Sequence, residues 1–493
     1  MKHALPICSV LLFLSASAVA DVRLPDVLCD HMVLQQQSDA VIWGWAYGGE
    51  TVIVEASWGV KAKTAANDKG EWKVVLKTPA AQTLDNGLHP ENITISVPNE
   101  NMVQIKDILI GEVWVCSGQS NMAMMPAPEY PAGRNAWFGE AFWKEESLLA
   151  SRPALRLFNV EKAASPVPRD NCRGAIPDHL TPKKDENGLL PEVKHGWQPC
   201  TLETANNFSS VAYYFGSRLQ QTLNIPVGLI HSSVGGTGIE SWVGLPALRT
   251  VKGYEGAGPS STRGGAAAHF NAMIAPLTPM KIRGVIWYQG ESNVGNENYA
   301  KLFETLIGDW RKSFDCGDFP FYFVQIAPSH SGGLAAAKLR EAQSSALQLP
   351  HTGMALTMDV SDANNIHPSN KRDVGIRLSL QALSKTYGIK DVVADGPVFQ
   401  ALALKDGKLR VSFRDVGGGL QSRDGKPLNC FQVAGVDGKF VPATAVIEGD
   451  EVVISNVDVD APKAVRFSWG DADFPNLMCK DGLPVAQFRA EVK

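Results

Sequence analysis

The feature that most constrains the fold of this chain is a series of short apolar runs separated by helix-like segments. The runs show no alternation of polar and apolar residues, and they are Val113–Cys116, Val227–Ile230, Gly284–Tyr288, Phe321–Ile326 and Gly353–Met358. Runs of this kind are typical of strands buried on both faces, as in a parallel sheet. Because helical patterns separate them, the sequence predicts an open α/β sheet over about residues 104–390.

Three segments between or after these runs have the periodicity of amphipathic helices. They are residues 209–223, 298–314 and 370–387, each with apolar side chains recurring every three or four positions. A sheet of parallel strands joined by helices places its functional loops at the carboxyl ends of the strands. The loops that follow the apolar runs are therefore where we expect functional residues.

β-rich segments flank this central region. A chain of 493 residues is too long for one core, so two or three domains are expected. Residues 21–103 contain short runs rich in Val, Ile, Trp and Thr between Gly-containing turns, which predicts an N-terminal β-sandwich. Residues 391–493 return to this pattern and predict a C-terminal β-rich module. Residues 125–203 are rich in Pro and charged residues, which predicts an insertion in the α/β domain.

The first twenty residues have the features of a secretory signal peptide. Lys2 and His3 precede an apolar run, and Ala18-Val19-Ala20 forms a small-x-small cleavage site. The apolar run is too short to span a bilayer, and no other long apolar stretch occurs. We therefore expect residues 1–20 to be removed from a secreted or periplasmic protein, with no membrane as a partner after cleavage.

Cysteine usage and charge narrow the classes of function. Of eight cysteines, Cys8 lies in the predicted signal peptide, and Cys172 and Cys200 are the pair that we expect to form a disulfide. The absence of C-x-x-C and H-E-x-x-H motifs leaves no candidate metal site. A net charge of −5 without a Lys/Arg-rich run makes nucleic acid an unexpected partner.

Ser120 and His367 are the candidates for nucleophilic chemistry. Ser120 follows the first apolar run, and Gly118 permits a tight turn before it. A serine hydroxyl is a weak nucleophile and needs an adjacent base, usually an imidazole oriented by a third group. An isolated serine here equally fits a helix cap, and an isolated His before Pro a loop residue. Their shared location at the carboxyl ends of predicted strands favours the catalytic interpretation.

Two further loops fall at the same edge of the predicted sheet. The segment HSSVGGTGIESW follows one strand and YQGESN follows another. Acyl transfer places negative charge on a carbonyl oxygen, which fixed N–H donors stabilise by roughly 3–4 kcal/mol each. Gly235 and Gly236 are candidates for a backbone donor and Gln289 for a side-chain donor. Taken singly, each also fits an ordinary loop position.

Four segments together resemble the sialate O-acetylesterase family within the SGNH-hydrolase superfamily. They are GQSNM, GGTGIESW, IWYQGESN and DxxDxNNIHP, and the resemblance extends over most of the chain. It implies an SGNH-type, flavodoxin-like parallel sheet with flanking β-sandwich modules, and no cofactor. It also implies that Ser120 is the nucleophile, that His367 is the general base, and that the oxyanion hole contains the Ser120 N–H, Gly235 or Gly236, and the Gln289 amide.

The third member of the catalytic group stays open. Most of the superfamily has an Asp three residues before the His, where this chain has Asn364. Asp362, in the same loop, is our candidate, whereas Asp359 is closer to the strand and is expected to be structural. The alternative is a Ser–His dyad in which a backbone carbonyl near Asn365 holds the imidazole.

Three further residues match positions of the family, and we expect them to fix loops rather than to take part in chemistry. They are Glu240, Trp242 and Glu291.

The sequence therefore predicts a secreted carbohydrate O-acetylesterase that works through an acyl-enzyme. Its expected partner is an acetylated sugar or glycan, either sialic acid or a hemicellulose such as xylan or xyloglucan. One alternative is a non-catalytic glycan-binding protein with a degenerate hydrolase domain, which the intact Ser120, Gln289 and His367 disfavour. Another is an esterase or lipase of different acyl specificity, which the polar 125–203 segment disfavours. Oligomeric state is not predicted.

Overall fold

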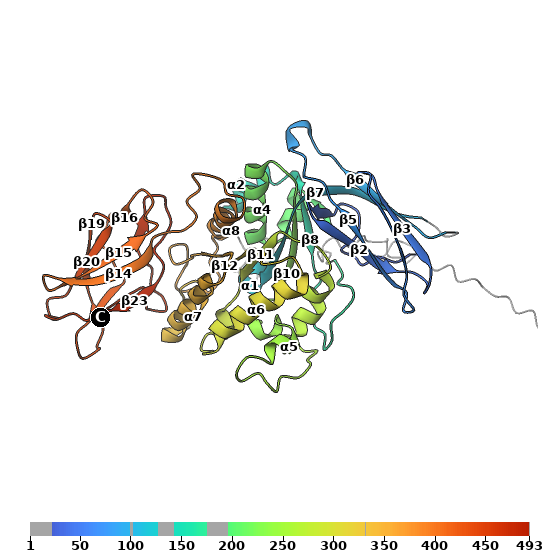
Figure 1. The fold of residues 1–493 in the computed structure, drawn as a ribbon. Coiled ribbons are helices and arrows are strands. Elements are labelled where there is room, and N and C mark those ends of the chain that lie inside the picture. Colours follow the sequence, from blue (N-terminus) through green and yellow to red (C-terminus); the bar gives the residue numbers. More distant parts are fainter. Residues whose placement is uncertain (1–21, 99–101, 127–141, 175–195, 331, 493) are drawn as a thin grey trace, which may run out of the picture.

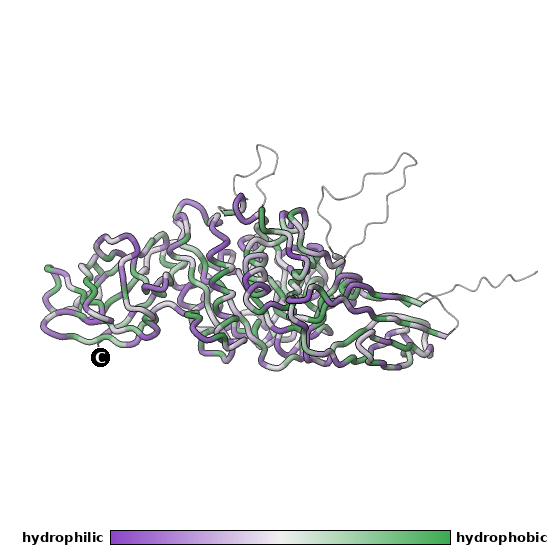
Figure 2. Tube along the Cα trace, turned by 90° about the horizontal axis from the view of Figure 1, so that it is seen from above, coloured by the Kyte–Doolittle hydropathy of each residue, from purple (hydrophilic) through white to green (hydrophobic). Residues whose placement is uncertain are grey.

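Three parts of the chain lie in a row, with a helix-containing domain between two β-rich modules (Figures 1 and 2). The computed structural model describes residues 22–98, 102–126, 142–174, 196–330 and 332–492. The predicted signal peptide lies outside these residues. Within them, no helix is both long enough and apolar enough to cross a membrane.

The five apolar runs are confirmed as strands that pair in parallel in a central sheet. The strand order along the sheet is β13-β12-β11-β7-β10-β8-β9. Because β9 pairs antiparallel with β8, the sheet is mixed rather than purely parallel. The strands are β7 (Val103–Gly118), β8 (Arg152–Asn159), β9 (Gln198–Cys200), β10 (Val227–Ser233), β11 (Gly284–Tyr288), β12 (Phe321–Val324) and β13 (Thr352–Ala355).

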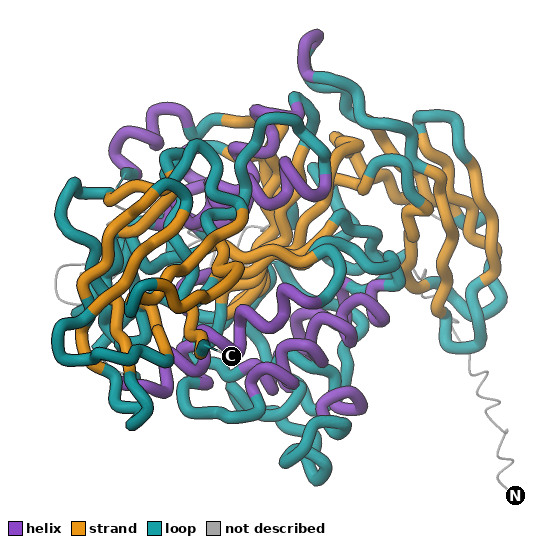
Figure 3. Tube along the Cα trace, turned by 60° about the vertical axis from the view of Figure 1, so that its left-hand side comes forward, coloured by secondary structure: helices purple, strands orange, loops and turns teal. Residues whose placement is uncertain are grey.

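Helices cover both faces of this sheet, which explains why its strands lack alternation (Figure 3). Along β7, Val113 and Val115 belong to the hydrophobic cluster that contains α6 (Tyr299–Phe314). Trp114 and Cys116, which point to the other face, belong to a second cluster with the side chains of the helices α4 and α8. Both side-chain sets are therefore buried, as expected for strands covered on two sides.

The three predicted helices occur, although the last is shorter than its pattern. They are α4 (Ser210–Leu223), α6, and α8 (Lys371–Gln381), which continues as a π-helical turn over Ala382–Thr386. The remaining helices are α1 (Ser120–Ala123), α2 (Trp143–Glu146), α3 (Leu202–Asn206), α5 (Leu245–Leu248) and α7 (Gly333–Ser345).

Strand β7 joins the N-terminal module to the central sheet. Its first half pairs antiparallel with β6, whereas its second half pairs in parallel with β10 and β11. A separate antiparallel pair, β2–β5, completes the module. The strands of this module are β1 (Val33–Gln35), β2 (Asp39–Trp45), β3 (Thr51–Ala56), β4 (Lys61–Ala65), β5 (Glu71–Lys77) and β6 (Glu91–Ser96).

The C-terminal module consists of antiparallel strands around their own hydrophobic cluster. Its strands are β14 (Val398–Lys405), β15 (Lys408–Arg414), β16 (Leu420–Ser422), β17 (Phe431–Ala434), β18 (Val441–Pro442), β19 (Thr444–Glu448), β20 (Glu451–Ser455), β21 (Ala464–Phe467), β22 (Leu477–Cys479) and β23 (Phe488–Glu491). Arg340 of α7 is fully buried against this module and donates to Gln487 Oε1 at 2.7 Å and to the Gly470 carbonyl at 2.6 Å. The module is thereby fixed to the central α/β domain.

Two expectations from the sequence differ from the structure. The range 125–203, expected to be an insertion, contains β8, which pairs in parallel with β10 and is part of the sheet. The expected Cys172–Cys200 disulfide is wrong, because both residues are free, buried thiols that belong to different hydrophobic clusters. Burial raises the pKa of each thiol to about 12. Pro and charge content alone did not reveal the β8 strand, which precedes both cysteines in the chain.

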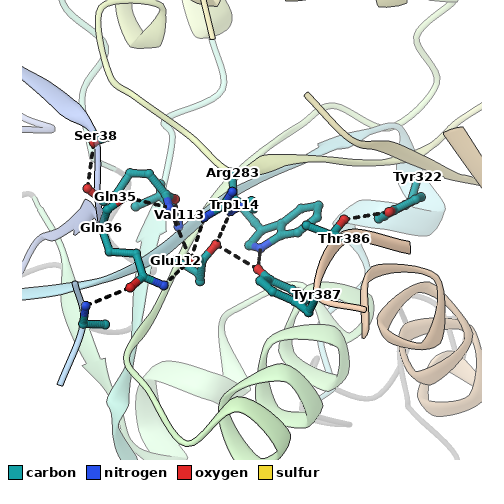
Figure 4. A network of polar contacts seen from close by, with 11 residues as sticks. Gln35, Gln36, Ser38, Glu112, Val113, Trp114, Arg283, Tyr322, Thr386 and Tyr387 are labelled. Atoms are coloured by element: carbon teal, nitrogen blue, oxygen red, sulfur yellow. Dashed lines mark hydrogen bonds and ion pairs between the residues drawn. The ribbon is translucent and has the colours of Figure 1, made fainter. Parts of the chain in front are cut away.

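A fully buried carboxylate, that of Glu112, holds three parts of the chain together where β7 enters the central sheet (Figure 4). It accepts hydrogen bonds from Gln36 Nε2 at 2.6 Å, Arg283 Nε at 2.5 Å and the Tyr387 hydroxyl at 2.9 Å. These partners come from the N-terminal module, the segment before β11 and the segment after α8. A buried carboxylate is tolerated when its oxygens are satisfied in this way.

Replacing Glu112 by Ala is expected to lower the free energy of unfolding by about 3–5 kcal/mol, because the buried donors lose their shared acceptor. Urea denaturation measures the change. The matched control is Glu304→Ala on α6, which removes an exposed carboxylate paired only with Lys301 and should change the free energy by less than about 1 kcal/mol. Equal effects of the two substitutions would contradict this account of Glu112.

Candidate active site

Ser120 lies at the end of β7, where the backbones of β7 and β11 approach closely. Gly118 has φ +142°, and a Cβ at this position would lie 2.1 Å from the Tyr288 carbonyl oxygen. Only glycine fits there, which is the reason for the Gly before the serine. The Gln119 N–H donates to the same Tyr288 carbonyl at 3.0 Å. The chain then turns into α1, with Ser120 as its first residue.

His367 lies in the loop between β13 and α8, and its imidazole reaches the serine. The distance between His367 Nε2 and Ser120 Oγ is 2.8 Å, although 247 positions separate the residues. Helix α8 is capped by Asn370, whose side chain accepts from the Asp373 N–H at 3.1 Å. This cap fixes where the loop ends and the helix begins. The two residues singled out from the sequence are therefore neighbours in space.

The surroundings of His367 favour its neutral form. Burial is the larger effect and the nearby Lys371 cation the smaller one, and both lower the pKa of the imidazole below its ordinary value. A neutral imidazole is the form that can accept a proton. The histidine is therefore available as a base at neutral pH.

The Gly235–Gly236 loop lies against the serine. A Cβ on Gly235 would be 3.3 Å from Ser120 Cβ. Thr237 Oγ1 donates to the Val234 carbonyl at 2.7 Å, and Arg263 Nη2 donates to the Gly235 carbonyl. In a trans peptide the N–H points opposite to the carbonyl, so these two contacts fix the directions of the Gly235 and Gly236 N–H groups.

Three backbone donors are available around the serine. Within the described ranges, no acceptor bonds to the N–H groups of Ser120, Gly235 and Gly236. Gly236 has φ +73°, a conformation that glycine adopts without strain. Donors of this kind, fixed in direction and without a partner, are suited to an oxygen that becomes negative during a reaction.

The amide of Gln289 is hydrogen-bonded to other protein groups in the structure. Its amide nitrogen donates to the Thr237 carbonyl at 3.1 Å and to Asn293 Oδ1 at 2.7 Å, and its oxygen accepts from the Tyr299 hydroxyl at 3.0 Å. Both amide hydrogens therefore have acceptors in the protein. In this arrangement Gln289 joins the 234–239 and 289–293 loops rather than offering an N–H to Ser120.

Two of the residues expected to fix loops do so around Gln289. Asn293 Nδ2 donates to Glu240 Oε2 at 2.9 Å, and Asn293 Oδ1 accepts from the Ile239 N–H at 2.9 Å. The Trp242 indole N–H donates to Thr237 Oγ1 at 2.9 Å. The loop beside the serine is held on both sides, which favours a fixed geometry for its N–H groups.

The two candidate aspartates have different surroundings. Asp359 forms a bidentate ion pair with Arg377, at 2.7 and 2.6 Å, and both side chains are largely buried. Asp362 is exposed, and its carboxylate accepts the Asn364 N–H at 2.9 Å. The His367 N–H donates to Asn365 Oδ1 at 2.9 Å, so the backbone of the histidine is held within its own loop.

Three residues near the serine and histidine were not assigned a role from the sequence. Asn121 stands in the GQSNM segment, Lys371 begins α8, and the exposed Arg263 lies over Gly235. The only signal for Asn121 was its place next to the serine. Lys371 is fully buried, which its sequence context does not indicate because lysine is almost never fully buried.

Comparison with known proteins agrees with these features. The model of the family described as "Carbohydrate esterase, sialic acid-specific acetylesterase" matches residues 188–384. The sialate O-acetylesterase of Homo sapiens is 31% identical over 441 residues, which cover 80% of this chain and 77% of that protein. The sialate O-acetylesterase of Mus musculus is 29% identical over 527 residues, which cover 92% and 91% of the two chains.

One solved structure is similar over nearly the whole length. It is a carbohydrate acetylesterase from Xanthomonas citri, with a TM-score of 0.82 and 32% identity, covering 96% of this chain and all of that one (100%). The arrangement of a central α/β domain between β-rich modules is thus shared with this solved structure.

Gly235→Ala is expected to lower kcat/KM for p-nitrophenyl acetate at least about tenfold, because the new methyl group would displace Ser120 or its loop. The reason is the 3.3 Å approach of that Cβ to Ser120. The control is Gly308→Ala on the exposed side of α6, where a Cβ meets nothing within 4 Å. Unchanged activity in Gly235→Ala, with the control also unchanged, would show that this loop does not contact the reacting groups.

Proposed function

Because the chain belongs to the sialate O-acetylesterase family of carbohydrate esterases, we propose that it hydrolyses O-acetyl esters on sugars, with Ser120 as nucleophile and His367 as general base. The observation that supports this proposal most directly is the 2.8 Å distance between Ser120 Oγ and His367 Nε2. A base at hydrogen-bond distance is what a serine hydroxyl needs to become a nucleophile.

The proposed reaction has two halves. Ser120 Oγ attacks the acetyl carbonyl while His367 Nε2 takes the hydroxyl proton, which gives a tetrahedral oxyanion. Collapse of this species breaks the bond to the sugar oxygen, and His367 returns the proton to that oxygen. Water, deprotonated by His367, then attacks the carbonyl of the acetyl-serine. The bond to Ser120 Oγ breaks, His367 returns the proton to this oxygen, and acetic acid leaves and ionises to acetate. Each half leaves the histidine neutral and the atoms balanced.

Backbone N–H groups are the proposed oxyanion donors. Those of Ser120, Gly235 and Gly236 are supported by their lack of an acceptor in the described ranges and by the contacts that fix the glycine loop. Gln289 belongs to the same loop pair. To act as a direct donor it would have to release one of its two present acceptors.

A Ser–His dyad is favoured over a triad by the contacts of the histidine loop. Asp362 is the candidate for a triad, but its carboxylate is exposed and accepts from a backbone N–H two residues further on. Asp359 is engaged by Arg377. The loop itself, through Asn365 and the backbone around it, is the proposed means of orienting His367.

The proposed substrates are acetylated sialic acid and acetylated hemicelluloses such as xylan or xyloglucan. An SGNH-type fold of the central domain and export directed by residues 1–20 belong to the same proposal. Acetate release from the three substrates, measured side by side, identifies which sugar is used. Comparison of acetyl with longer-chain esters tests the lipase-like alternative, and glycan binding without turnover would support the non-catalytic one.

Ser120→Ala and His367→Ala should each reduce hydrolysis of p-nitrophenyl acetate by at least about a thousandfold, because each removes one half of the reacting pair. Because both residues are only half-buried, the thermal unfolding midpoint should stay close to that of the wild type, with the smaller change in Ser120→Ala, which removes a single oxygen. Near-wild-type turnover in either variant would overturn the assignment.

Asp362→Ala should lower kcat/KM less than about tenfold if the dyad operates, whereas removing an orienting carboxylate from a triad costs up to about ten thousandfold. Asp359→Ala serves as the comparison. It breaks a buried ion pair and is expected to lower the free energy of unfolding by about 3 kcal/mol. A loss of more than a hundredfold in Asp362→Ala, in a folded protein, would establish the triad instead.

A further inference from the structure

We propose that the buried Asn121 and Lys371, together with Glu291, form a positioning unit that holds the histidine loop against the nucleophile, and that the Lys371 cation, tied to this loop through Asn121, helps to set the pH range of hydrolysis. This proposal rests on the function proposed above. It concerns residues that act through Ser120 and His367, by way of their contacts with the two segments that carry them.

The unit forms a second connection between the two catalytic segments. Asn121 directly follows Ser120, and its amide nitrogen donates to the Ile366 carbonyl at 3.1 Å. Ile366 directly precedes His367. The contact between Ser120 and His367 is therefore paralleled, one residue away on each segment, by a side-chain-to-backbone hydrogen bond. Two parallel contacts restrict rotation of the histidine loop more than one contact does.

Lys371 fixes which way the Asn121 amide points. Its Nζ donates to Asn121 Oδ1 at 2.6 Å, and both residues are fully buried. An ammonium group can only donate, so it requires the amide oxygen and leaves the amide nitrogen for other acceptors. Those acceptors are the Ile366 carbonyl and Glu291 Oε1. With the lysine in place, the amide is in the one orientation that bonds to the histidine loop.

A buried lysine at this position is costly, which argues for a role. Removing an ammonium group from water costs several kcal/mol, and a hydrophobic residue of similar volume is often at least as stable. The ammonium group of Lys371 donates to Asn121 Oδ1, and the carboxylate of Glu291 accepts from the nitrogen of the same amide. Burial raises the pKa of Glu291, which weakens the carboxylate as a counter-charge at acidic pH.

The charges around His367 come from several elements. They are Lys371 on α8, Glu291 after β11, Asp362 in the histidine loop, Arg263 over the glycine loop, and the mutually paired Asp359 and Arg377. Helix α1 contributes no acidic or basic side chain. Of these charges, Lys371 acts directly on the imidazole and opposes a second positive charge there, in the same direction as burial. Removing the lysine should therefore favour the protonated histidine and move the acid limb of activity to higher pH.

The test measures kcat/KM for p-nitrophenyl acetate across pH in wild type, Lys371→Met and Lys371→Arg. In Lys371→Met the acid limb should shift to higher pH because the cation no longer opposes protonation of His367, and the plateau should fall at least about tenfold because the Asn121 amide loses its orientation. Lys371→Arg keeps the charge and should leave the acid limb in place. The matched control is Lys385→Met, which removes a cation at the other end of the same helical segment, where it pairs with Asp395.

A second variant protects the test against a folding defect in Lys371→Met. Asn121→Asp is nearly isosteric, removes the donor to the Ile366 carbonyl and adds a negative charge, so it should move the acid limb in the same direction. Thermal unfolding identifies which variants are folded. An acid limb that stays in place in folded Lys371→Met or Asn121→Asp would overturn the proposal. If wild type and Ser120→Ala hydrolysed the ester equally, the proposed function itself would fail.

Discussion

The close approach of two backbones at Gly118 is the constraint on which the site depends. At this point β7 passes so near the Tyr288 carbonyl that any side chain would clash with it. The contact ends β7 and places Ser120 beyond the edge of the sheet, at the first residue of α1. It also brings the end of β11, with Gln289 and the loop that follows, beside the serine. The geometry of the reactive hydroxyl is therefore set by main-chain packing of two central strands.

Two polar networks lie at the two ends of the part of β7 that runs through the central sheet. Glu112 joins the N-terminal module, the segment before β11 and the end of the helical domain where β7 enters the central sheet. Asn121, just past the carboxyl end of β7, joins Lys371, Glu291 and the histidine loop. Each network links segments that are far apart in the sequence. The C-terminal module adds a contact to the same loop, since Arg423 donates to the Asp359 carbonyl at 2.9 Å.

Sequence patterns predicted the elements whose signals are local. Apolar runs and helical periodicity located the five parallel strands and the helices α4, α6 and α8, because burial on both faces or on one stripe leaves a direct pattern. The strand β8 and the free thiols of Cys172 and Cys200 were not predicted, since neither Pro content nor cysteine spacing reports what packs nearby. The pairing of Ser120 with His367 followed from the edge of the sheet that they share. The hydrogen bonds of the Gln289 amide and the burial of Lys371 depend on contacts between distant loops, which no single segment encodes.

The group that orients the histidine and the charge of Lys371 both affect the same quantity, the pKa of the imidazole. A carboxylate next to an imidazole stabilises the imidazolium and raises its pKa, whereas a buried ammonium group lowers it. A dyad whose histidine is held by its own loop, with Lys371 nearby, gives a weaker base that stays neutral to lower pH. Such a base is sufficient for an acetyl ester, because a sugar alcohol leaves from the tetrahedral species more readily than an amide nitrogen does. On the proposed mechanism, the burial of Lys371 next to the histidine loop, rather than an added aspartate, would keep His367 in its neutral form as the pH falls.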